Sequence, residues 1–401
     1  MSAALELDVA LERILATAIP GEGSTTVALT QALGRVLARD VVSPIDVPGF
    51  DNSAMDGYAL RAVDADKPLT VTQRVAAGAV GVAVAPGTAA RIFTGAPMPP
   101  GADSVAIQEN CQLEADELIV NGSVRAGDNV RPRAQDIRTG ETVLAAGRRL
   151  RPQDIGLLAS VGLSQVEVRR ALRVAILSTG DELVEPGSGE PGVGQLYNSN
   201  RFTLAALLQG LGMSVIDGGI VPDDPDATAN ALRDAAARSD CVISSGGVSV
   251  GEEDHVRAQV ACLGHLDVWK LAIKPGKPLA FGRIFTTPFI GLPGNPTSVF
   301  VTFCLVARPF LLKLQGVSEP QSPRLCARAD FTVERAASRR DYLRVTLEND
   351  SQGLLARRFP NQSSGVLSSV SGSNALAVVP IGATVAPGDW VEVVPLDLLV
   401  C

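Results

Sequence analysis

The sequence is poor in histidine and in aromatic residues. Among its 401 residues are 2 His, 3 Tyr, 2 Trp and 11 Phe. A zinc site built on histidines is therefore not expected, and any bound metal would be a hard cation held by oxygen atoms. So few aromatic rings also argue against a base-stacking platform for single-stranded nucleic acid.

A surplus of positive charge is also missing. The sequence carries 35 Lys and Arg against 43 Asp and Glu, which gives a formal net charge of −8. General nucleic-acid binders need a basic face to meet the phosphate backbone, so we expect no nucleic-acid partner. With 46% hydrophobic and 19% charged residues, the composition is that of a globular protein with an ample core.

Paired cysteines and an uninterrupted apolar run of membrane length are absent from the sequence. None of the 6 cysteines lies in a CxxC pair, and Cys241 and Cys304 lie in apolar runs typical of core residues. The most apolar stretch, residues 297–316, is interrupted by basic residues, so we predict a buried helix rather than a membrane span. Residues 1–20 show no signal-peptide pattern, and we expect a cytoplasmic protein without a membrane partner.

Changes in composition and hydrophobic periodicity along the chain predict four domains. Residues 47–141 consist of short Val/Ile/Thr runs broken by Gly and Pro, which is typical of a β-rich domain. This domain interrupts an α+β domain formed by residues 1–46 and 142–171, which we expect to be helical through residue 44. Residues 317–401 alternate with period two, which favours a small C-terminal β-barrel or sandwich.

Residues 172–316 alternate apolar strands with helices. The run 172–178 is apolar except for Arg173 and Ser178, as in a buried parallel strand, and similar runs recur before later helical segments. Asn200 is the candidate N-cap of the first of these helices. The series predicts an open, doubly wound α/β sheet, in which ligands bind beyond the carboxyl ends of the strands.

Polar loops follow the predicted strands of this sheet and should meet at one edge. "SGGVSVG" (residues 245–251) leads into a helix and, with Ser249, offers a cradle of backbone amides for an anion. "LPGNPTS" (residues 292–298) opens the last helix of the domain. "KPGKP" adds the cations Lys274 and Lys277. Together the loops predict a site for a phosphate-containing ligand.

Carboxylates at the same edge point to a metal. They are Asp181, Glu182, Asp223 and Asp254. Mg²⁺ takes a few carboxylates together with water and phosphate oxygens, so we predict Mg²⁺ beside the phosphate. Plainer interpretations remain: the acidic pairs at 181–182 and 223–224 could cap helices, the Gly-rich loop could be only a tight turn, and the lysines could be solvated.

The β-rich range carries a second polar cluster. "PGFDNSAMDGYAL" (residues 48–60) contains Asp56, and Thr94 lies in a later Gly/Pro-rich turn. "RPRAQDIRTGE" brings Asp136 together with three arginines. These side chains could form capped turns and surface ion pairs, or they could belong to a shared site.

Seven long motifs occur in the order in which the MoeA/gephyrin E-domain family carries them. They are "PGFDNSAMDGYAL", "IFTGAPMPPGADSV", "LSTGDEL", "NSN", "ISSGGVSVGEED", "KLAIKPGKPLAFG" and "GLPGNPTS". The match covers nearly the whole chain, so the sequence resembles this family of molybdenumtransferases.

The resemblance implies a multidomain α/β fold. Its parts would be a doubly wound, MogA-like molybdopterin-binding domain (172–316), an inserted β-rich domain (47–141), an elongated α+β dimerisation domain (1–46 and 142–171) and a C-terminal β-barrel (317–401). The implied activity is Mg²⁺-dependent insertion of molybdate into adenylylated molybdopterin, with release of AMP. The implied partners are a second copy that completes the active site, a MogA-type molybdopterin adenylyltransferase, and molybdoenzymes or their chaperones.

The resemblance also assigns candidate roles to residues of this chain. The catalytic candidates are Asp56, Thr94 and Asp136, expected from the partner chain, and Glu182, Asp223 and Asp254. The candidates for Mg²⁺ are Asp181, Glu182 and Asp254. The candidates for molybdopterin and AMP are Ser178, Thr179, Gly180, Asn198, Ser199, Asn200, Ser245, Gly246, Gly247, Ser249, Gly251, Lys274, Pro275, Gly276, Lys277, Pro293, Gly294, Asn295 and Pro296. The candidates for molybdate are Ser298, Arg344 and Ser373, with Arg340, Ser364 and Ser368 as alternatives to the last two.

Three other functions compete with this interpretation. The chain could be a molybdopterin carrier or scaffold without turnover, although the intact acidic residues favour catalysis. It could be a nucleotidyltransferase with another substrate. Tungstate could also replace molybdate, because the two oxyanions are alike in size and charge.

Overall fold

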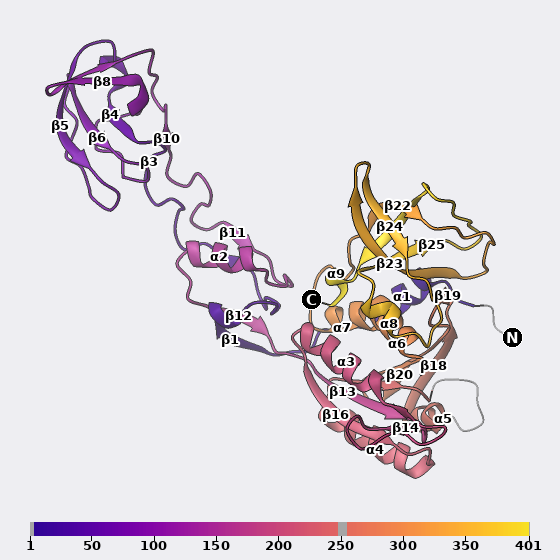
Figure 1. The fold of residues 1–401 in the computed structure, drawn as a ribbon. Coiled ribbons are helices and arrows are strands. Elements are labelled where there is room, and N and C mark those ends of the chain that lie inside the picture. The colour runs from indigo at the N-terminus through magenta and orange to yellow at the C-terminus, as the bar shows by residue number, and fades with distance from the viewer. Residues whose placement is uncertain (1–3, 248–254, 401) are drawn as a thin grey trace. The chain divides into compact units, whose positions relative to one another are not determined.

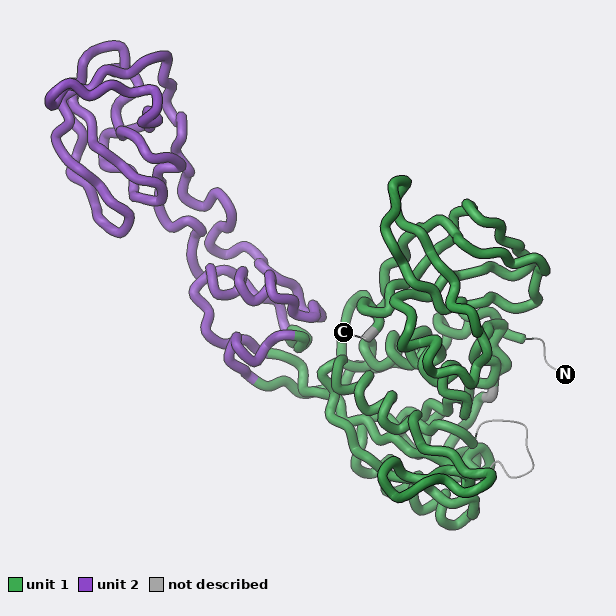
Figure 2. The backbone as a smooth tube through the Cα atoms, in the orientation of Figure 1, with its two compact units in different colours: residues 1–25, 34–38, 168–401 green, residues 26–33, 39–167 purple. Residues whose placement is uncertain are grey.

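The computed structural model describes residues 4–247 and 255–400. The chain divides into two compact units (Figure 2). Unit 1 contains residues 1–25, 34–38 and 168–401, and unit 2 contains residues 26–33 and 39–167. The chain passes from one unit to the other four times: within β1 (Ser24–Ala28), after residue 33, after residue 38 and within β12 (Gln165–Arg169). The division into four sequence ranges stays a prediction.

Unit 2 is built around a six-stranded sheet whose order is β7-β4-β6-β5-β9-β8 (Figure 1). Neighbouring residues on its strands enter different clusters of buried residues: Ala59 and Ala90 belong to one, and Leu60 and Ala89 to the other. Because side chains alternate between the faces of a strand, this sheet is covered on both faces. The strands are β4 (Gly57–Leu60), β5 (Leu69–Val75), β6 (Thr88–Ile92), β7 (Ser104–Ile107), β8 (Cys111–Glu114) and β9 (Glu117–Val120).

Two short antiparallel pairs and one helix complete unit 2. β3 (Asn52–Ser53) pairs with β10 (Val130–Arg131), and β2 (Val41–Val42) pairs with β11 (Thr142–Leu144). The α-helix is α2 (Pro152–Ser160). Three 3₁₀ turns accompany it: η1 (Leu29–Gln31), η2 (Ala62–Asp64) and η3 (Gln108–Asn110).

The helix predicted to continue through residue 44 is wrong. After α1 (Leu7–Ala16) the chain forms β1, η1 and β2 instead. The β-branched run Thr25–Val27 favours a strand, and Gly34 adopts φ +73°, which ends any helical path.

The α/β sheet of unit 1 has the order β16-β13-β17-β21-β20-β18. β13, β16, β17 and β21 run parallel, whereas β20 is antiparallel to both of its neighbours. β18 therefore points in the same direction as the parallel strands. The strands are β13 (Arg173–Thr179), β16 (Ser214–Val221), β17 (Cys241–Ser245), β18 (Gly264–Lys270), β20 (Pro278–Ile284) and β21 (Thr287–Leu292).

Helices cover both faces of this sheet, which confirms the doubly wound prediction (Figure 1). Val174 and Ile176 of β13 pack with α1, α3, α6 and α7, while Ala175 and Leu177 pack with α4 and α5. The helices are α3 (Ser199–Gly210), α4 (Pro225–Arg238), α5 (His255–Leu263), α6 (Pro296–Thr302) and α7 (Arg308–Leu314), with a π-helical turn at Phe303–Ala307.

The apolar stretch near residue 300 is a buried helix, as predicted. Within the described ranges, Pro296–Leu314 is the one helical stretch long and apolar enough to cross a membrane, with a mean hydropathy of 1.6. However, 89% of its apolar window is buried inside the protein. It therefore has the character of a core helix.

The C-terminal part of unit 1 is a closed five-stranded barrel, since the strand order β23-β24-β22-β26-β25 returns to β23. Its core contains Leu343, Val345, Ala377 and Val393, each at most 2% exposed. The barrel strands are β22 (Leu325–Asp330), β23 (Arg340–Asp350), β24 (Gly353–Arg358), β25 (Ala375–Val379) and β26 (Trp390–Pro395), and the remaining elements are α8 (Ser368–Ser371), α9 (Asp397–Val400) and the short strands β14 (Leu183–Val184), β15 (Leu196–Tyr197) and β19 (Ile273–Lys274).

Candidate functional site

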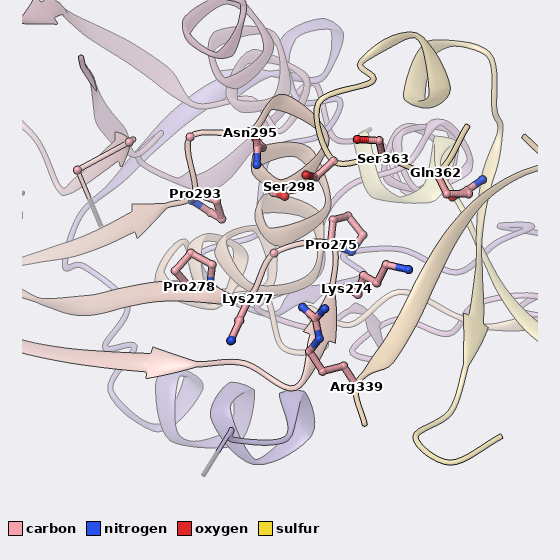
Figure 3. A pocket seen from close by; sticks show the side chains of 15 residues that line it. Lys274, Pro275, Lys277, Pro278, Pro293, Asn295, Ser298, Arg339, Gln362 and Ser363 are labelled. Atoms are coloured by element: carbon pink, nitrogen blue, oxygen red, sulfur yellow. The ribbon is translucent and has the colours of Figure 1, made fainter. Parts of the chain in front are cut away.

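Two cavities adjoin at the carboxyl edge of the α/β sheet. The first, here the cationic cavity, has a volume of about 490 Å³ and is lined by residues 246–247, 274–278, 293–295, 298, 339 and 362–364 (Figure 3). The second, here the amide cavity, has a volume of about 570 Å³ and is lined by residues 179, 182–183, 196–200, 245–246, 294–296 and 365. Gly246, Gly294 and Asn295 line both. Loops far apart in the sequence thus meet at one edge, as predicted from their order.

Most of the predicted ligand-binding residues line one of these cavities. The cationic cavity is lined by Gly246, Gly247, Lys274, Pro275, Gly276, Lys277, Pro293, Gly294, Asn295 and Ser298. The amide cavity is lined by Thr179, Glu182, Asn198, Ser199, Asn200, Ser245, Gly246, Gly294, Asn295 and Pro296. Ser178 lies beneath them, 3% exposed, with its hydroxyl 3.4 Å from Asn198 Oδ1.

The glycines of the loop after β17 are required by close packing. Gly246 and Gly247 have φ values of +86° and +66°, in the left-handed region. A Cβ atom would lie 2.8 Å from the carbonyl oxygen of Thr179 at position 246, and 2.5 Å from Val256 at position 247. The loop is therefore pressed against the end of β13, where a larger side chain cannot fit. Its continuation, with the candidates Ser249, Gly251 and Asp254, lies outside the described residues.

Two asparagines connect the start of α3 to the same edge. The N-cap of α3 is Asn198, whose side chain accepts a hydrogen bond from the amide of Arg201, so the predicted cap at Asn200 is wrong. Asn200 lies inside the first turn, and its Nδ2 donates to the carbonyl of Gly294 at 2.7 Å. This bond links α3 to the loop after β21, and it explains why both segments line the amide cavity.

The amide cavity contains polar atoms that have no protein partner. Thr179 Oγ1, Asn198 Nδ2 and Asn200 Oδ1 are buried without a hydrogen bond to any described residue. Thr179 is 8% exposed and Asn198 1% exposed. Buried polar groups are nearly always satisfied, so these atoms indicate a ligand or water that hydrogen-bonds to them. Tyr197, which the sequence did not single out, is the aromatic residue among the described lining residues.

The KPGKP loop carries the charge of the cationic cavity. Lys274 and Lys277 are exposed, whereas Pro275 and Gly276 between them are buried. A Cβ at Gly276, where φ is +105°, would lie 2.3 Å from Thr302 Oγ1. The close approach of this loop to α6 therefore requires glycine.

Arg344 lines neither cavity, and its contact with molybdate stays a prediction. It is 1% exposed. Its Nε donates to Ser369 Oγ at 3.1 Å, and its terminal nitrogens donate to the carbonyls of Tyr342 and Ser363 at 3.3 and 3.4 Å. Burial lowers the pKa of its guanidinium to about 10. Arg344 thus fixes the loop that contains Ser363, a residue that lines the cationic cavity.

Arg339 is the barrel arginine that lines the cationic cavity (Figure 3). It is adjacent to Arg340, which we considered and which instead pairs with Asp8 at 2.9 Å. Ser373 also lies outside both linings, whereas Ser364 and its neighbour Ser363 line the cationic cavity. Pattern reasoning could not separate these neighbours, since the strand register decides which side chain faces the cavity.

The acidic loops after β13 and β16 are tied to each other. The amide of Asp181 donates to Asp223 Oδ2 at 3.3 Å, and the amide of Asp223 donates to Asp181 Oδ1 at 3.1 Å. Asp224, not Asp223, caps α4 through the amide of Ala227 at 2.7 Å. Glu182 begins no helix and folds back over Gly180, whose added Cβ would lie 2.4 Å from Glu182 Oε2.

The carboxylates fit a hard cation in their chemistry. Asp181 and Asp223 each use one oxygen in the reciprocal bonds, which leaves carboxylate oxygen free, the kind of ligand that Mg²⁺ prefers. Among the described residues, no group of three His, Cys, Asp or Glu side chains is arranged to hold a metal. The third predicted ligand, Asp254, belongs to the part of the chain that is not described.

In unit 2, the structure brings Asp56 and Thr94 together. The carboxylate of Asp56 accepts hydrogen bonds from the amide and the hydroxyl of Thr94, both at 2.8 Å. These bonds lower the pKa of Asp56. Asp136 is exposed, and its side chain has no contact with either residue in the described structure. The nearby Arg133 pairs with Asp46 rather than with Asp136.

Three protein-family models match successive parts of the chain. Residues 5–162 match the MoeA N-terminal region (domain I and II), residues 175–313 match a probable molybdopterin binding domain, and residues 327–396 match the MoeA C-terminal region (domain IV).

Individual relatives agree along nearly the whole chain. The molybdopterin molybdenumtransferase of Haemophilus influenzae is 40% identical over 378 residues, covering 92% of this chain and 93% of the relative. That of Nostoc sp. is 39% identical, covering 93% and 88%. The crystal structure of the molybdopterin biosynthesis MoeA protein from Pyrococcus horikoshii OT3 superimposes with a TM-score of 0.86 at 31% identity, covering 98% of this chain and 100% of that one. The chain belongs to the MoeA family of molybdopterin molybdenumtransferases.

Proposed function

We propose that this chain inserts molybdate into adenylylated molybdopterin and releases AMP, as a step of molybdenum cofactor biosynthesis. The observation that carries the proposal is the pair of adjoining cavities with different chemistry. Lys274, Lys277 and Arg339 line one cavity, whereas amides, hydroxyls and the carboxylate of Glu182 line the other. A substrate with an anionic end and a neutral heterocycle needs these two environments side by side. The names of the relatives support the same activity.

We assign the anionic part of the reaction to the cationic cavity. Its described lining includes three basic side chains and no carboxylate. Molybdate is a dianion, and charge develops on the phosphoryl oxygens as the phosphoanhydride breaks, so preorganised cations stabilise both. Ser298 and Ser363 add hydroxyl groups that can donate hydrogen bonds to oxyanion oxygens.

We assign the heterocyclic part of the substrate to the amide cavity. Asn198 Nδ2 can donate and Asn200 Oδ1 can accept, which matches the mixed edges of a pterin or an adenine. Tyr197 lines the cavity and is 41% exposed, so its ring can stack on a planar ligand. Its hydroxyl donates to the carbonyl of Gly189 at 2.7 Å, which holds the ring in place.

The proposed chemistry needs no covalent bond to the enzyme. An oxygen of molybdate attacks the adenylyl phosphorus, the anhydride P–O bond breaks, and its electron pair remains on the molybdopterin phosphate. The two dithiolene sulfurs then bond to molybdenum as the Mo–O bond to the adenylyl group breaks. AMP leaves with that oxygen, and the thiol protons pass to the oxygens of the products. Lys274 and Lys277, which line the cationic cavity, would offset the charge of this transition state.

The metal and the second copy belong to the same proposal. Asp181, Glu182 and Asp254 would hold Mg²⁺, which as a bound cation lowers the charge on the phosphoryl oxygens. Asp223, hydrogen-bonded to Asp181, would keep that carboxylate in position. Asp56, Thr94 and Asp136 would be supplied by the partner chain of a homodimer. A cytoplasmic location, a MogA-type adenylyltransferase upstream and molybdoenzymes downstream complete the proposal.

AMP release from adenylylated molybdopterin tests the proposal directly. With Mg²⁺ present, release should rise when molybdate is added and should be accompanied by active cofactor. Asp223→Asn should reduce this release at least tenfold, whereas the exposed control Asp226→Asn, two residues beyond the cap of α4, should leave it within about twofold. Tight binding without molybdate-dependent release would instead indicate a carrier.

A further inference from the structure

A third cavity in unit 1, here the barrel pocket, adjoins the cationic cavity. It has a volume of about 440 Å³, and its lining includes Lys274 and Arg339, which also line the cationic cavity. These two side chains therefore form a wall common to both. Arg339 directly precedes barrel strand β23, where Figure 3 shows its guanidinium.

The barrel pocket is positively charged in a chain of net charge −8. The basic residues of its lining are Lys274, Arg335, Arg339 and Arg358, and the acidic ones are Glu334 and Asp341, so four positive and two negative charges leave a formal charge of +2. Asp341 is already engaged, because its Oδ2 lies 3.1 Å from the ammonium of Lys274. The net charge of +2 thus comes from the three guanidinium groups, offset in part by Glu334.

Those guanidinium groups keep most of their donors free. Each carries five N–H donors. Arg358 donates one hydrogen bond, to the carbonyl of Thr332 at 3.4 Å, and Arg339 donates one, to the carbonyl of Ile273 at 3.3 Å. Arg335 has no hydrogen bond or ion pair with any residue that the structure describes. Unused guanidinium donors around a small cavity suit the several oxygens of a tetrahedral anion.

We propose that the barrel pocket binds a small tetrahedral dianion of the class that molybdate and sulfate share, and holds it beside the cationic cavity. That the bound dianion is a reactant rests on the proposed function; the binding itself does not. A dianion in this pocket raises the local concentration of oxyanion next to the cavity where it reacts. Because Lys274 and Arg339 belong to both linings, the anion can transfer between them without losing all of its cationic contacts.

Oxyanion stoichiometry tests the proposal without substrate. Isothermal titration with molybdate, and separately with sulfate, should give two bound dianions per chain for the unaltered protein. The double variant Arg335→Gln/Arg358→Gln should bind one. Arg357→Gln is the matched control: it is the strand neighbour of Arg358, pairs with Asp330 at 2.9 Å, and should leave two. Lys277→Gln, which alters only the cationic cavity, should also bind one.

Turnover provides the second reading. In the double variant, the molybdate concentration that half-saturates AMP release should rise about tenfold, the effect of losing about 1.4 kcal/mol of oxyanion binding, with the maximal rate within about twofold. If the unaltered protein binds one oxyanion per chain, or the double variant binds two, the proposal that the barrel pocket binds a dianion is wrong. If the double variant binds one sulfate but still binds two molybdate ions per chain, the pocket does not supply molybdate. A last outcome is that neither the unaltered protein nor the double variant releases AMP, while the number of bound dianions still falls from two to one. That result would support dianion binding in the barrel pocket and contradict the proposed function.

Discussion

The ammonium of Lys274 lies 3.1 Å from Oδ2 of Asp341, joining the KPGKP loop of the α/β sheet to the first residues of barrel strand β23. The backbone reinforces the contact, because β19 pairs in parallel with β23 and places Lys274 opposite Asp341. Asp341 is 14% exposed and Lys274 is 49% exposed at the side chain. The ion pair therefore holds Lys274, one of the cations that line the cationic cavity, in position from the barrel side.

Asp341→Asn should impair turnover more than stability. An ion pair this open is worth about 1 kcal/mol or less, so the free energy of unfolding should change little. Releasing the ammonium of Lys274 should lower molybdate-dependent AMP release about tenfold, because a mobile cation stabilises the transition state less well. A double-mutant cycle with Lys274→Met tests whether Asp341 affects turnover through Lys274. If Asp341→Asn costs the same factor in the Lys274→Met background, Asp341 does not act through Lys274.

Thr94→Val should raise the pKa of Asp56. The backbone amide of Thr94 and then its hydroxyl lower this pKa, and valine removes the hydroxyl alone. Since the pKa is lowered in the folded chain, the carboxylate stays ionised as the pH falls; in the variant it should protonate at a higher pH. The acid limb of the pH–rate profile for AMP release should shift upward accordingly.

The control for Thr94 is Thr72→Val, an exposed threonine on β5. It should leave the acid limb unchanged. An unshifted acid limb in Thr94→Val, together with a raised pKa of Asp56 in a carboxyl NMR titration, would show that the ionisation of Asp56 does not limit the reaction.

Gly276→Ala should destabilise unit 1 by about 3 kcal/mol. The backbone at φ +105° and the overpacking against Thr302 each cost ~1–3 kcal/mol. Adding Thr302→Ala should recover about half of the loss, because it removes the oxygen 2.3 Å from the new Cβ. Thr302 Oγ1 has no described partner, so Thr302→Ala alone should cost little. Urea unfolding measures all three; no recovery in the double variant would exclude the steric explanation.

Asp240→Asn should reveal a pH-dependent contribution to stability. Burial raises the pKa of Asp240, but hydrogen bonds from Arg170 and Arg173 outweigh it and lower the pKa to about 2. A lowered pKa stabilises the fold above the ordinary value of 3.8, and this stabilisation disappears as the pH falls toward 2. The variant should lose at most about 2 kcal/mol at pH 7 and almost nothing near pH 2.

Tryptophan fluorescence can follow this unfolding, because Trp269 and Trp390 both lie in unit 1 with Asp240. The control is Asp234→Asn, whose carboxylate is 62% exposed and pairs with Arg238 one turn away on α4. It should change the free energy of unfolding by about 0.5 kcal/mol or less. An equal loss for Asp240→Asn at both pH values would contradict the role assigned to its ionisation.

The sequence was sufficient for the doubly wound sheet and for the convergence of its loops. A short run rich in apolar residues, such as 172–178, favours a buried strand, and the carboxyl ends of parallel strands share an edge. The antiparallel strand β20 was not predicted. It arises because the turn at Phe285, with φ 52°, reverses the chain directly into β21 and forms a hairpin.

Adjacent polar residues are where prediction from the sequence failed. Asn198 and Asn200 are both good capping residues, and only the actual start of α3 selects Asn198 and leaves Asn200 to hold Gly294. Asp223 and Asp224 differ in the same way: Asp224 caps α4, whereas Asp223 accepts a hydrogen bond from the amide of Asp181. A shift of one residue turns a side chain by about 100° on a helix, and composition does not record that shift.

By itself, the sequence determined the family, the α/β class and the set of loops that form the site, because these depend on long motifs and on the period of apolar residues. The tertiary structure decided which residues of those loops line the two cavities. Arg339 rather than Arg344 lines the cationic cavity because barrel closure buries the guanidinium of Arg344 among carbonyls. Register and closure are collective properties of many strands, so no local stretch of sequence specifies them.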